Sequence, residues 1–376
     1  MQTSPSATEA RPTAPTPRDD RLRWLDLLRF LAAFAVVVVH ARGHAIVDFG
    51  SLPPEQRTAP VAAFFALTRV GNEAVTVFFV LSGFLVGGKA LERIAAGTFR
   101  LRDYAIDRVS RIYVPLLPAL ALTAVLASAI DADWSFGSLV GNLAGLQGIA
   151  VDPFGLNRPL WSLAYEIWFY VLAGAIGVGA VHRGLHLRAA AAVVLVAALF
   201  TILSPTFLFC WLIGALAWVR RPSRLSPAMA CLAAALIVYG VAGVEAGMES
   251  RTVKGPSIVA FLPPWGVAHL LLSTGMALLI QQLVAWTPRA AWLAAIERVG
   301  TPLGAFSYTL YLVHYPVIRA IVPHLGGRLE RVDARSLGSV ALLTAASVAV
   351  SVVLYFLFER HTGRVRGWLR GALGAR

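Results

Sequence analysis

The chain has 376 residues, of which 57% are hydrophobic and 14% are charged, and its mean hydropathy is +0.69. This composition excludes an ordinary soluble globular enzyme, because such a chain contains only a few short apolar runs. The formal net charge of +13 does not indicate a nucleic-acid-binding protein, since the basic residues form short clusters rather than one stripe. Apolar runs of roughly 17 to 23 residues recur from end to end, each long enough to cross a bilayer core of about 30 Å. We therefore predict an all-α integral membrane protein.

We expect about ten transmembrane helices with both termini in the cytoplasm. In this arrangement 22 of the 33 Lys and Arg residues fall on the side of the amino terminus and 8 fall on the other side, in agreement with the positive-inside rule. The fifth and sixth predicted spans are short, and one broken pair is an alternative. The predicted spans are residues 24–44, 63–88, 105–129, 160–181, 188–203, 206–219, 226–244, 259–285, 301–322 and 336–358.

The chain divides into a transmembrane domain, residues 21–360, between two tails. Residues 1–20 are rich in Pro, Ser and Thr and are expected to be a disordered cytoplasmic tail, and residues 361–376 a basic cytoplasmic tail. The two cysteines, Cys210 and Cys231, indicate neither a disulfide framework nor a metal site.

The first span, WLDLLRFLAAFAVVVVH, carries Arg29 and His40. Eleven residues separate them, which is three helical turns plus about 20°, so they share one face at an axial separation of about 16 Å. Asp26, three residues before Arg29, is the expected partner of the guanidinium. An arginine inside a span costs about 2.5 to 3.5 kcal/mol and is a functional candidate, although snorkelling to the interface is an alternative. His44 follows one turn after His40, but no third ligand is evident, so we expect no metal site.

The second span ends in TVFFVLSGFLVGGK, where Ser82, Gly83 and Gly87 permit close approach of either a neighbouring helix or a ligand. The third span opens with DRVSRIYVP. Its Arg108 and Arg111 are neighbours on a helix N-terminus, which favours phosphate groups. Ordinary positive-inside charge is the alternative for these two residues.

The fourth span, RPLWSLAYEIWFY, carries Trp161, Ser162 and Glu166. Because the fourth span enters the membrane from the outside, we expect Glu166 in the outer half, level with His40. A carboxylate beside an imidazole can fix its tautomer and raise its basicity. Pairing of Glu166 with some other helix is the alternative.

The ninth span, GAFSYTLYLVHYP, and the end of the tenth offer further polar groups. The ninth contains Ser307, Tyr308, Tyr311 and His314, which line a cavity or, for the last two, belong to an aromatic belt. Glu359, at the inner end of the tenth span, is expected to pair with one of the cytoplasmic arginines.

These stretches together resemble the acyltransferase 3 family of membrane proteins over nearly the whole chain. The Arg29 to His40 spacing alone is a weak signal, and the order of the motifs makes the resemblance specific: LDLLR, VFFVLSGF, RVSRIYVP, PLWSLAYE and FSYTLYLVH. The resemblance implies that Arg29 and His40 are essential for activity, that Arg108 and Arg111 belong to an inner arginine motif, and that Glu166 is the acidic residue of the fourth-span motif. Some family members carry a fused extracellular hydrolase-like domain, which we do not expect here.

Such a protein transfers an acyl group, expected to be acetyl, from cytoplasmic acyl-CoA to a hydroxyl of a carbohydrate, glycolipid or other cell-envelope acceptor. We expect it in the bacterial inner membrane with acyl-CoA as donor substrate and no permanently bound cofactor. Arg29, Ser82 and Tyr113 join the two inner arginines as candidate donor-binding residues, and His40 is the candidate general base. A transporter or flippase for an anionic or glycosyl substrate is the alternative function.

Overall fold

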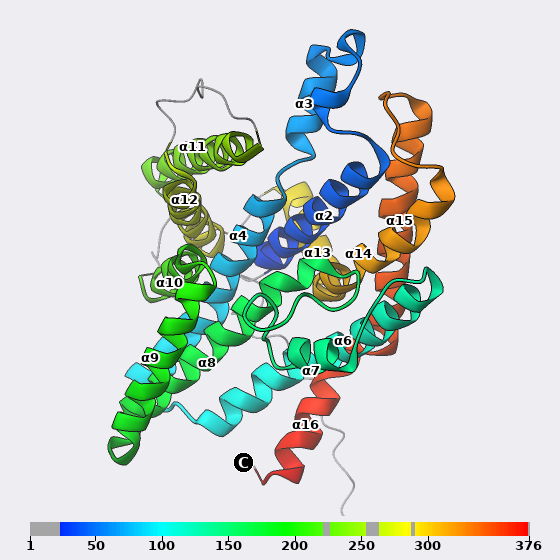
Figure 1. Cartoon of the computed structure of the whole chain (residues 1–376). Coiled ribbons are helices and arrows are strands. Elements are labelled where there is room, and N and C mark those ends of the chain that lie inside the picture. The colour runs from blue at the N-terminus through cyan, green and yellow to red at the C-terminus, as the bar shows by residue number, and fades with distance from the viewer. Residues whose placement is uncertain (1–22, 221–225, 253–262, 287–289, 375–376) are drawn as a thin grey trace, which may run out of the picture.

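The computed structural model describes residues 23–220, 226–252, 263–286 and 290–374. These residues form helices joined by loops, with no strand among them (Figure 1). The predicted tail 1–20 lies outside this part of the chain. The helices are α2 (Arg23–Ala45), α3 (Ala59–Leu67), α4 (Gly71–Ser82), the π-helical η3 (Gly83–Gly87), α5 (Gly88–Ala95), α6 (Leu101–Ala129), α7 (Phe136–Leu143), α8 (Trp161–Val181), α9 (His186–Ile202), α10 (Pro205–Val219), α11 (Pro227–Thr252), α12 (Trp265–Ala285), α13 (Ala291–Ala305), α14 (Ser307–Ile321), α15 (Ala334–Leu357) and α16 (Thr362–Ala372). Short 3-10 turns are η1 (Phe49–Ser51), η2 (Pro54–Gln56), η4 (Arg158–Leu160), η5 (Arg183–Leu185), η6 (Val322–Leu325) and η7 (Glu359–His361).

The structure confirms an all-helical protein with the helices of a multi-pass membrane protein. Among the described residues, seven segments are long and apolar enough to cross a bilayer. α9 and α10 are apolar but have only 17 and 15 residues. At 1.5 Å per residue they extend about 26 and 22 Å, less than the bilayer core of about 30 Å. The ninth predicted span is divided at Phe306 between α13 and α14. The count of ten transmembrane helices therefore stays a prediction, as does the cytoplasmic location of the two termini. The seven segments are Arg23–Ala45, Ala59–Ala95, Leu101–Ala129, Arg158–Val181, Pro227–Gly247, Trp265–Ala285 and Ala334–Ala372.

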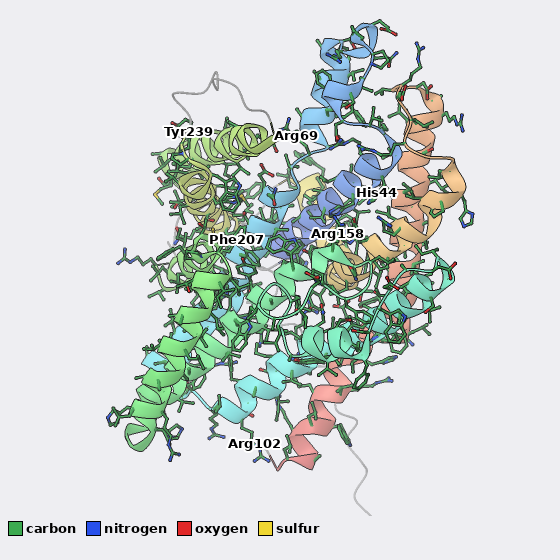
Figure 2. The ribbon with its side chains drawn as sticks, in the orientation of Figure 1. His44, Arg69, Arg102, Arg158, Phe207 and Tyr239 are labelled. Carbon is green, nitrogen blue, oxygen red and sulfur yellow. The ribbon has the colours of Figure 1, made fainter. Side chains whose placement is uncertain are left out.

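Helix α2 lies inside the bundle, where it contacts α4, α13, α14 and α15 (Figure 1). Small buried side chains, Ala32 and Ala33, allow neighbouring helices to approach it. In Figure 2, Arg69, between α3 and α4, lies in the upper half of the view, and Arg102, in the first turn of α6, lies near the bottom. Polar side chains of α2 therefore face other helices, which is where intramembrane charge is tolerated.

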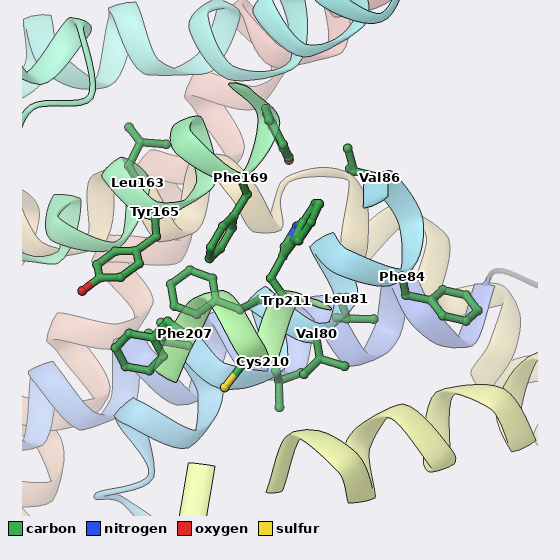
Figure 3. Packing of buried hydrophobic residues seen from close by; sticks show 14 of the residues in the cluster. Val80, Leu81, Phe84, Val86, Leu163, Tyr165, Phe169, Phe207, Cys210 and Trp211 are labelled. Atoms are coloured by element: carbon green, nitrogen blue, oxygen red, sulfur yellow. The ribbon is translucent and has the colours of Figure 1, made fainter. Parts of the chain in front are cut away.

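An aromatic cluster joins α4, α8 and α10 (Figure 3). Phe169 of α8 stacks on Trp211 of α10 with ring centroids 5.3 Å apart, and Phe79 of α4 packs against Phe169 at 5.3 Å and Phe207 at 5.2 Å. Such pairs contribute about 0.5–1.5 kcal/mol each beyond area burial. The cluster fixes α8, which carries Glu166, relative to α4.

Helices α4 and α10 approach each other at two glycines. A Cβ atom at Gly83 would overlap the carbonyl oxygen of Trp211, and one at Gly214 would overlap the carbonyl oxygen of Val80. Gly83 also begins the π-helical turn between α4 and α5. Of the two uses left open for the small residues of this span, the structure supports helix packing at Gly83.

Candidate active site

Arg29 and His40 both project from the unbroken helix α2, but they line two different cavities. We call these the arginine cavity, which contains Arg29, and the histidine cavity, which contains His40. The two residues are therefore not a contacting pair, in agreement with their separation of about 16 Å along a helix axis.

The arginine cavity has a volume of about 650 Å³ and is bordered by residues from α2, α4, α5, α6, α8, α13, α14 and α16. Seven basic and three acidic side chains line it, an excess of positive charge that favours an anionic ligand. The basic residues are Arg23, Arg29, Lys89, Arg93, Arg108, Arg111 and Arg366, and the acidic residues are Asp26, Asp107 and Glu166.

Arg29 is paired with Asp26, one turn earlier on α2, as the spacing predicts. The Nη1 atom of Arg29 lies 2.9 Å from Oδ1 of Asp26, and both side chains line the arginine cavity. Only 21% of the Arg29 side chain is exposed. The guanidinium therefore ends in a cavity of the bundle, beside the carboxylate of Asp26.

Arg111 is held by Glu359, which confirms that Glu359 pairs with an arginine of this cluster. Its Nη1 atom lies 2.8 Å from Oε1 of Glu359, whose side chain is 2% exposed. Oε2 of Glu359 accepts hydrogen bonds from the backbone N–H and the hydroxyl of Thr309, at 3.2 and 2.6 Å. The carboxylate thus joins α6, α14 and η7 and fixes Arg111 at the cavity.

Glu166 also lies in the arginine cavity, which corrects the expectation that it accompanies His40. Its Oε1 atom accepts a 2.5 Å hydrogen bond from the hydroxyl of Tyr170, one turn later on α8. The physical reason is that the face of α8 bearing Glu166 is turned toward the cavity that holds Arg29 and Arg111, and a carboxylate is stabilised among cations. The position of Glu166 along its span, which the sequence indicates, does not specify which cavity its helix face points toward.

Two polar atoms of the arginine cavity are buried without a hydrogen-bond partner among the described residues, namely Nε of Arg108 and the hydroxyl oxygen of Tyr308. The Arg108 guanidinium lies 5.4 Å from the centroid of the Tyr170 ring, and the Arg111 guanidinium lies 5.2 Å from that of Tyr308. An unsatisfied buried polar atom costs about 1–3 kcal/mol. Both atoms are therefore free to bond a water molecule or a ligand in the cavity.

The histidine cavity has a volume of about 290 Å³. Besides His40 its lining includes Arg42, Trp161 and the ion pair formed by Arg69 and Glu245. Val75 and Tyr311 line both cavities and form part of the wall between them.

His40 is hydrogen-bonded to His314 of α14, with Nδ1 of His40 at 3.0 Å from Nε2 of His314. The Nδ1 atom of His314 faces the carbonyl oxygens of Tyr311 at 2.8 Å and Leu310 at 3.2 Å. Carbonyls only accept hydrogen bonds, so Nδ1 of a neutral His314 carries the proton and its Nε2 is an acceptor. His40 must then donate from Nδ1, which leaves its Nε2 unprotonated. His314 thus fixes the tautomer of His40, a role that we had expected of Glu166.

Tyr311 is fixed in the wall by the start of α8. Its hydroxyl donates a 3.0 Å hydrogen bond to the carbonyl of Pro159 and lies 2.6 Å from the hydroxyl oxygen of Ser162. Tyr311 and His314 are 8% and 0% exposed. Neither side chain has the exposure of an aromatic belt: Tyr311 lines both cavities, and His314 lines neither but is buried behind His40.

Of three other predicted site residues, Ser82, Ser307 and Tyr113, only Ser82 lines one of the two cavities. Ser82 lines the arginine cavity and accepts a 3.3 Å hydrogen bond from the indole of Trp211. Ser307 donates to the carbonyl of Gly304 at 2.7 Å, and Tyr113 donates to the carbonyl of Leu143 at 2.7 Å. Neither Ser307 nor Tyr113 lines either of the two cavities, and their hydrogen bonds brace the fold.

The sequence analysis did not identify Tyr170, Arg42 or Glu245 as site residues. Tyr170 follows Glu166 by four residues, a spacing that places two side chains side by side on a helix and that would have found it. Arg42 follows His40 by two residues, which carries no comparable signal. Glu245 reaches the histidine cavity through the packing of α11, which no local pattern specifies.

Comparisons with known proteins identify relatives of the chain. A family model described as an acyltransferase domain, of the acyltransferase 3 type, matches residues 22–356. Acyltransferase MdmB of Streptomyces mycarofaciens is 26% identical over 366 residues, covering 90% of this chain and 89% of that protein. An uncharacterised protein of Haemophilus influenzae is 30% identical over 110 residues, covering 26% of this chain and 45% of that protein. No solved structure gives a significant match.

We predict that Glu359→Gln destabilises the protein by about 1.5–3 kcal/mol, because it removes the charge from a buried hydrogen-bonded group. The measurement is the thermal unfolding midpoint of the purified protein in detergent. Asp48→Asn is the matched control, since Asp48 pairs with Arg328 at 3.3 Å but its side chain is 75% exposed, and exposed pairs contribute about 0–1 kcal/mol. Equal midpoints for the two variants would contradict the structural role of Glu359.

Proposed function

Because the chain belongs to the acyltransferase 3 family, we propose that it transfers an acyl group, acetyl in the simplest case, from acyl-CoA to a hydroxyl group. In this proposal acyl-CoA binds in the arginine cavity from the cytoplasm. A carbohydrate or glycolipid acceptor binds in the histidine cavity from the outer side of the bacterial inner membrane. The observation that carries the proposal is that the two cavities share Val75 and Tyr311 as a wall. Family membership favours acyl transfer over the alternative of transport.

The charge of the arginine cavity supports the donor assignment. Acyl-CoA carries its phosphates at one end and its thioester at the other, joined by a thin pantetheine arm. Arg108 and Arg111 offer guanidinium groups whose fork geometry matches phosphate oxygens. Arg29 of α2 lines the same cavity, and we assign to it either the neutralisation of a phosphate or a place along the path of the arm.

The tautomer of His40 supports its assignment as general base. Nε2 of His40, left unprotonated by the hydrogen bond to His314, accepts the proton of the acceptor hydroxyl as its oxygen attacks the thioester carbon. The new C–O bond forms, the C–S bond breaks, and the thiolate of CoA takes the proton from His40. The products are an ester and free CoA thiol.

Tyr308 is the group that best fits the oxyanion of this reaction. Its buried hydroxyl lies in the arginine cavity without a partner among the described residues, and Arg111 lies over its ring. A donor placed in advance where negative charge develops lowers the barrier without reorganisation. We assign to Tyr308 the hydrogen bond to the thioester oxygen.

The lining of the histidine cavity supports a sugar-like acceptor. Trp161 presents an aromatic surface, and Arg42 together with the Arg69–Glu245 pair presents polar groups. Apolar walls with a few convergent polar groups are typical of sites for small polar molecules.

The proposal predicts that His40→Ala lowers acyl transfer by about 10²–10⁴-fold, the usual contribution of a general base. Because His40 does not line the arginine cavity, binding of acetyl-CoA should be unchanged. The measurement is transfer of label from radiolabelled acetyl-CoA to isolated cell envelopes by the protein in proteoliposomes, with acetyl-CoA binding measured separately by titration calorimetry. Wild-type proteoliposomes that carry label across the membrane without ester formation would instead support transport.

We predict that His314 acts by orienting His40. The effect of replacing His314 then depends on whether the new side chain accepts a hydrogen bond from Nδ1 of His40. His314→Gln keeps an oxygen that accepts the His40 Nδ1–H, whereas His314→Leu keeps none. We expect His314→Leu to have a kcat at least about tenfold below that of His314→Gln, with similar KM for acetyl-CoA, because base orientation affects the chemical step. Equal kcat values for the two variants would refute the positioning role.

Tyr308→Phe is predicted to lower kcat by about 10²-fold, as loss of one oxyanion donor does, with little change in KM for acetyl-CoA. Tyr113→Phe is the matched control, since it removes a tyrosine hydroxyl that bonds the carbonyl of Leu143 outside both cavities. The measurement is steady-state release of CoA thiol in the presence of cell envelopes. A loss of activity that is the same in both variants would contradict the assignment of Tyr308.

A further inference from the structure

Arg366 of the carboxyl-terminal helix α16 lines the arginine cavity, although none of the roles assigned above involves this helix. α16 packs against α6 beside this cavity (Figure 1). We propose that α16 completes the donor site, with Arg366 binding a phosphate group of acyl-CoA. This inference rests on the proposed function, because it names a further contact of the same donor.

Helix α16 is attached to α6 at both of its ends. At its start the hydroxyl of Thr362 donates a 2.6 Å hydrogen bond to the carbonyl of Glu359, whose side chain holds Arg111 of α6 at 2.8 Å. Near its end Nη2 of Arg370 lies 2.9 Å from Oδ1 of Asp107 on α6. These contacts fix the orientation of α16, and with it the place of Arg366.

Arg366 lies between these attachments and retains a net positive environment. Its Nε atom is 3.3 Å from Oδ1 of Asp107 and 3.4 Å from the hydroxyl oxygen of Ser110. The same carboxylate oxygen also holds Arg370. One negative charge is thus shared by two positive ones, so the group of three attracts an anion.

The position of Arg366 fits a phosphate ligand rather than only a structural brace. Arg108, next to Asp107 in the chain, lines the same cavity and has a buried Nε atom without a partner among the described residues. Arg366 is 34% exposed at its side chain and lies in the cavity, whereas Arg370 does not line it. A brace alone would be provided by Arg370. Each guanidinium presents a planar fork of N–H donors that matches phosphate oxygens, and both Arg108 and Arg366 line this cavity.

The test measures binding of CoA, dephospho-CoA and pantetheine by titration calorimetry to the full-length protein in nanodiscs. Arg366→Gln is expected to weaken CoA binding by about tenfold, the loss of one charge-assisted hydrogen bond, and to leave pantetheine binding unchanged. If dephospho-CoA binding is unaffected, the ligand of Arg366 is the 3′-phosphate; if it weakens equally, the ligand is the diphosphate. Both outcomes support the proposal.

Arg364→Gln is the matched control, because Arg364 also lies on α16 but is exposed and does not line the arginine cavity. Equal weakening in Arg364→Gln, equal weakening for pantetheine, or unchanged binding of CoA by Arg366→Gln would each overturn the inference. Wild-type protein that binds CoA but does not consume acetyl-CoA would refute the proposed function instead, so the two failures are distinguishable.

Discussion

The structure depends on one constraint, the need to stabilise charged side chains inside a bundle of apolar helices. A charge at the centre of a span costs several kcal/mol unless it meets a partner, a cavity or water. Arg29 meets Asp26 on its own helix, and Arg111 meets Glu359 from a segment 248 residues later. The need for a partner therefore favours the helix orientation in which the charged face points into the bundle. Faces of this kind line the arginine cavity.

One carboxylate, that of Glu359, both positions Arg111 at the arginine cavity and links the surrounding helices. Glu359 is bonded both to Arg111 of α6 and to Thr309 of α14, and it lies directly after α15. Breaking the pair would leave a buried charge without a partner, which is more costly than the pair is favourable. The contacts that bring α6, α14 and α15 together are thus the same contacts that hold a guanidinium at the proposed donor site.

Local patterns predicted those features that depend on one helix or on composition. The spacing of Asp26 and Arg29 predicted their ion pair, because a helix of 3.6 residues per turn fixes which residues are neighbours on its surface. The cavity that Glu166 faces and the partner of His40 were not predictable in the same way, since they depend on how α8 and α14 are rotated and tilted. Helix α16 was not predicted, because the many basic residues of 361–376 indicate a tail outside the membrane and do not show whether that tail is helical.

The wall between the two cavities follows from a backbone defect in α14. Pro316 has no N–H, so it leaves the carbonyl of Leu312 without its usual donor four residues on. The buried Asn157 supplies one, with its Nδ2 atom at 2.8 Å from that oxygen. Since the hydroxyl of Tyr311 also bonds the carbonyl of Pro159, the segment before α8 is tied to α14 at two points. A proline that weakens a helix thereby attaches the helix bearing Tyr311 and His314 to the start of α8, and this attachment holds Tyr311 in place where the two cavities adjoin.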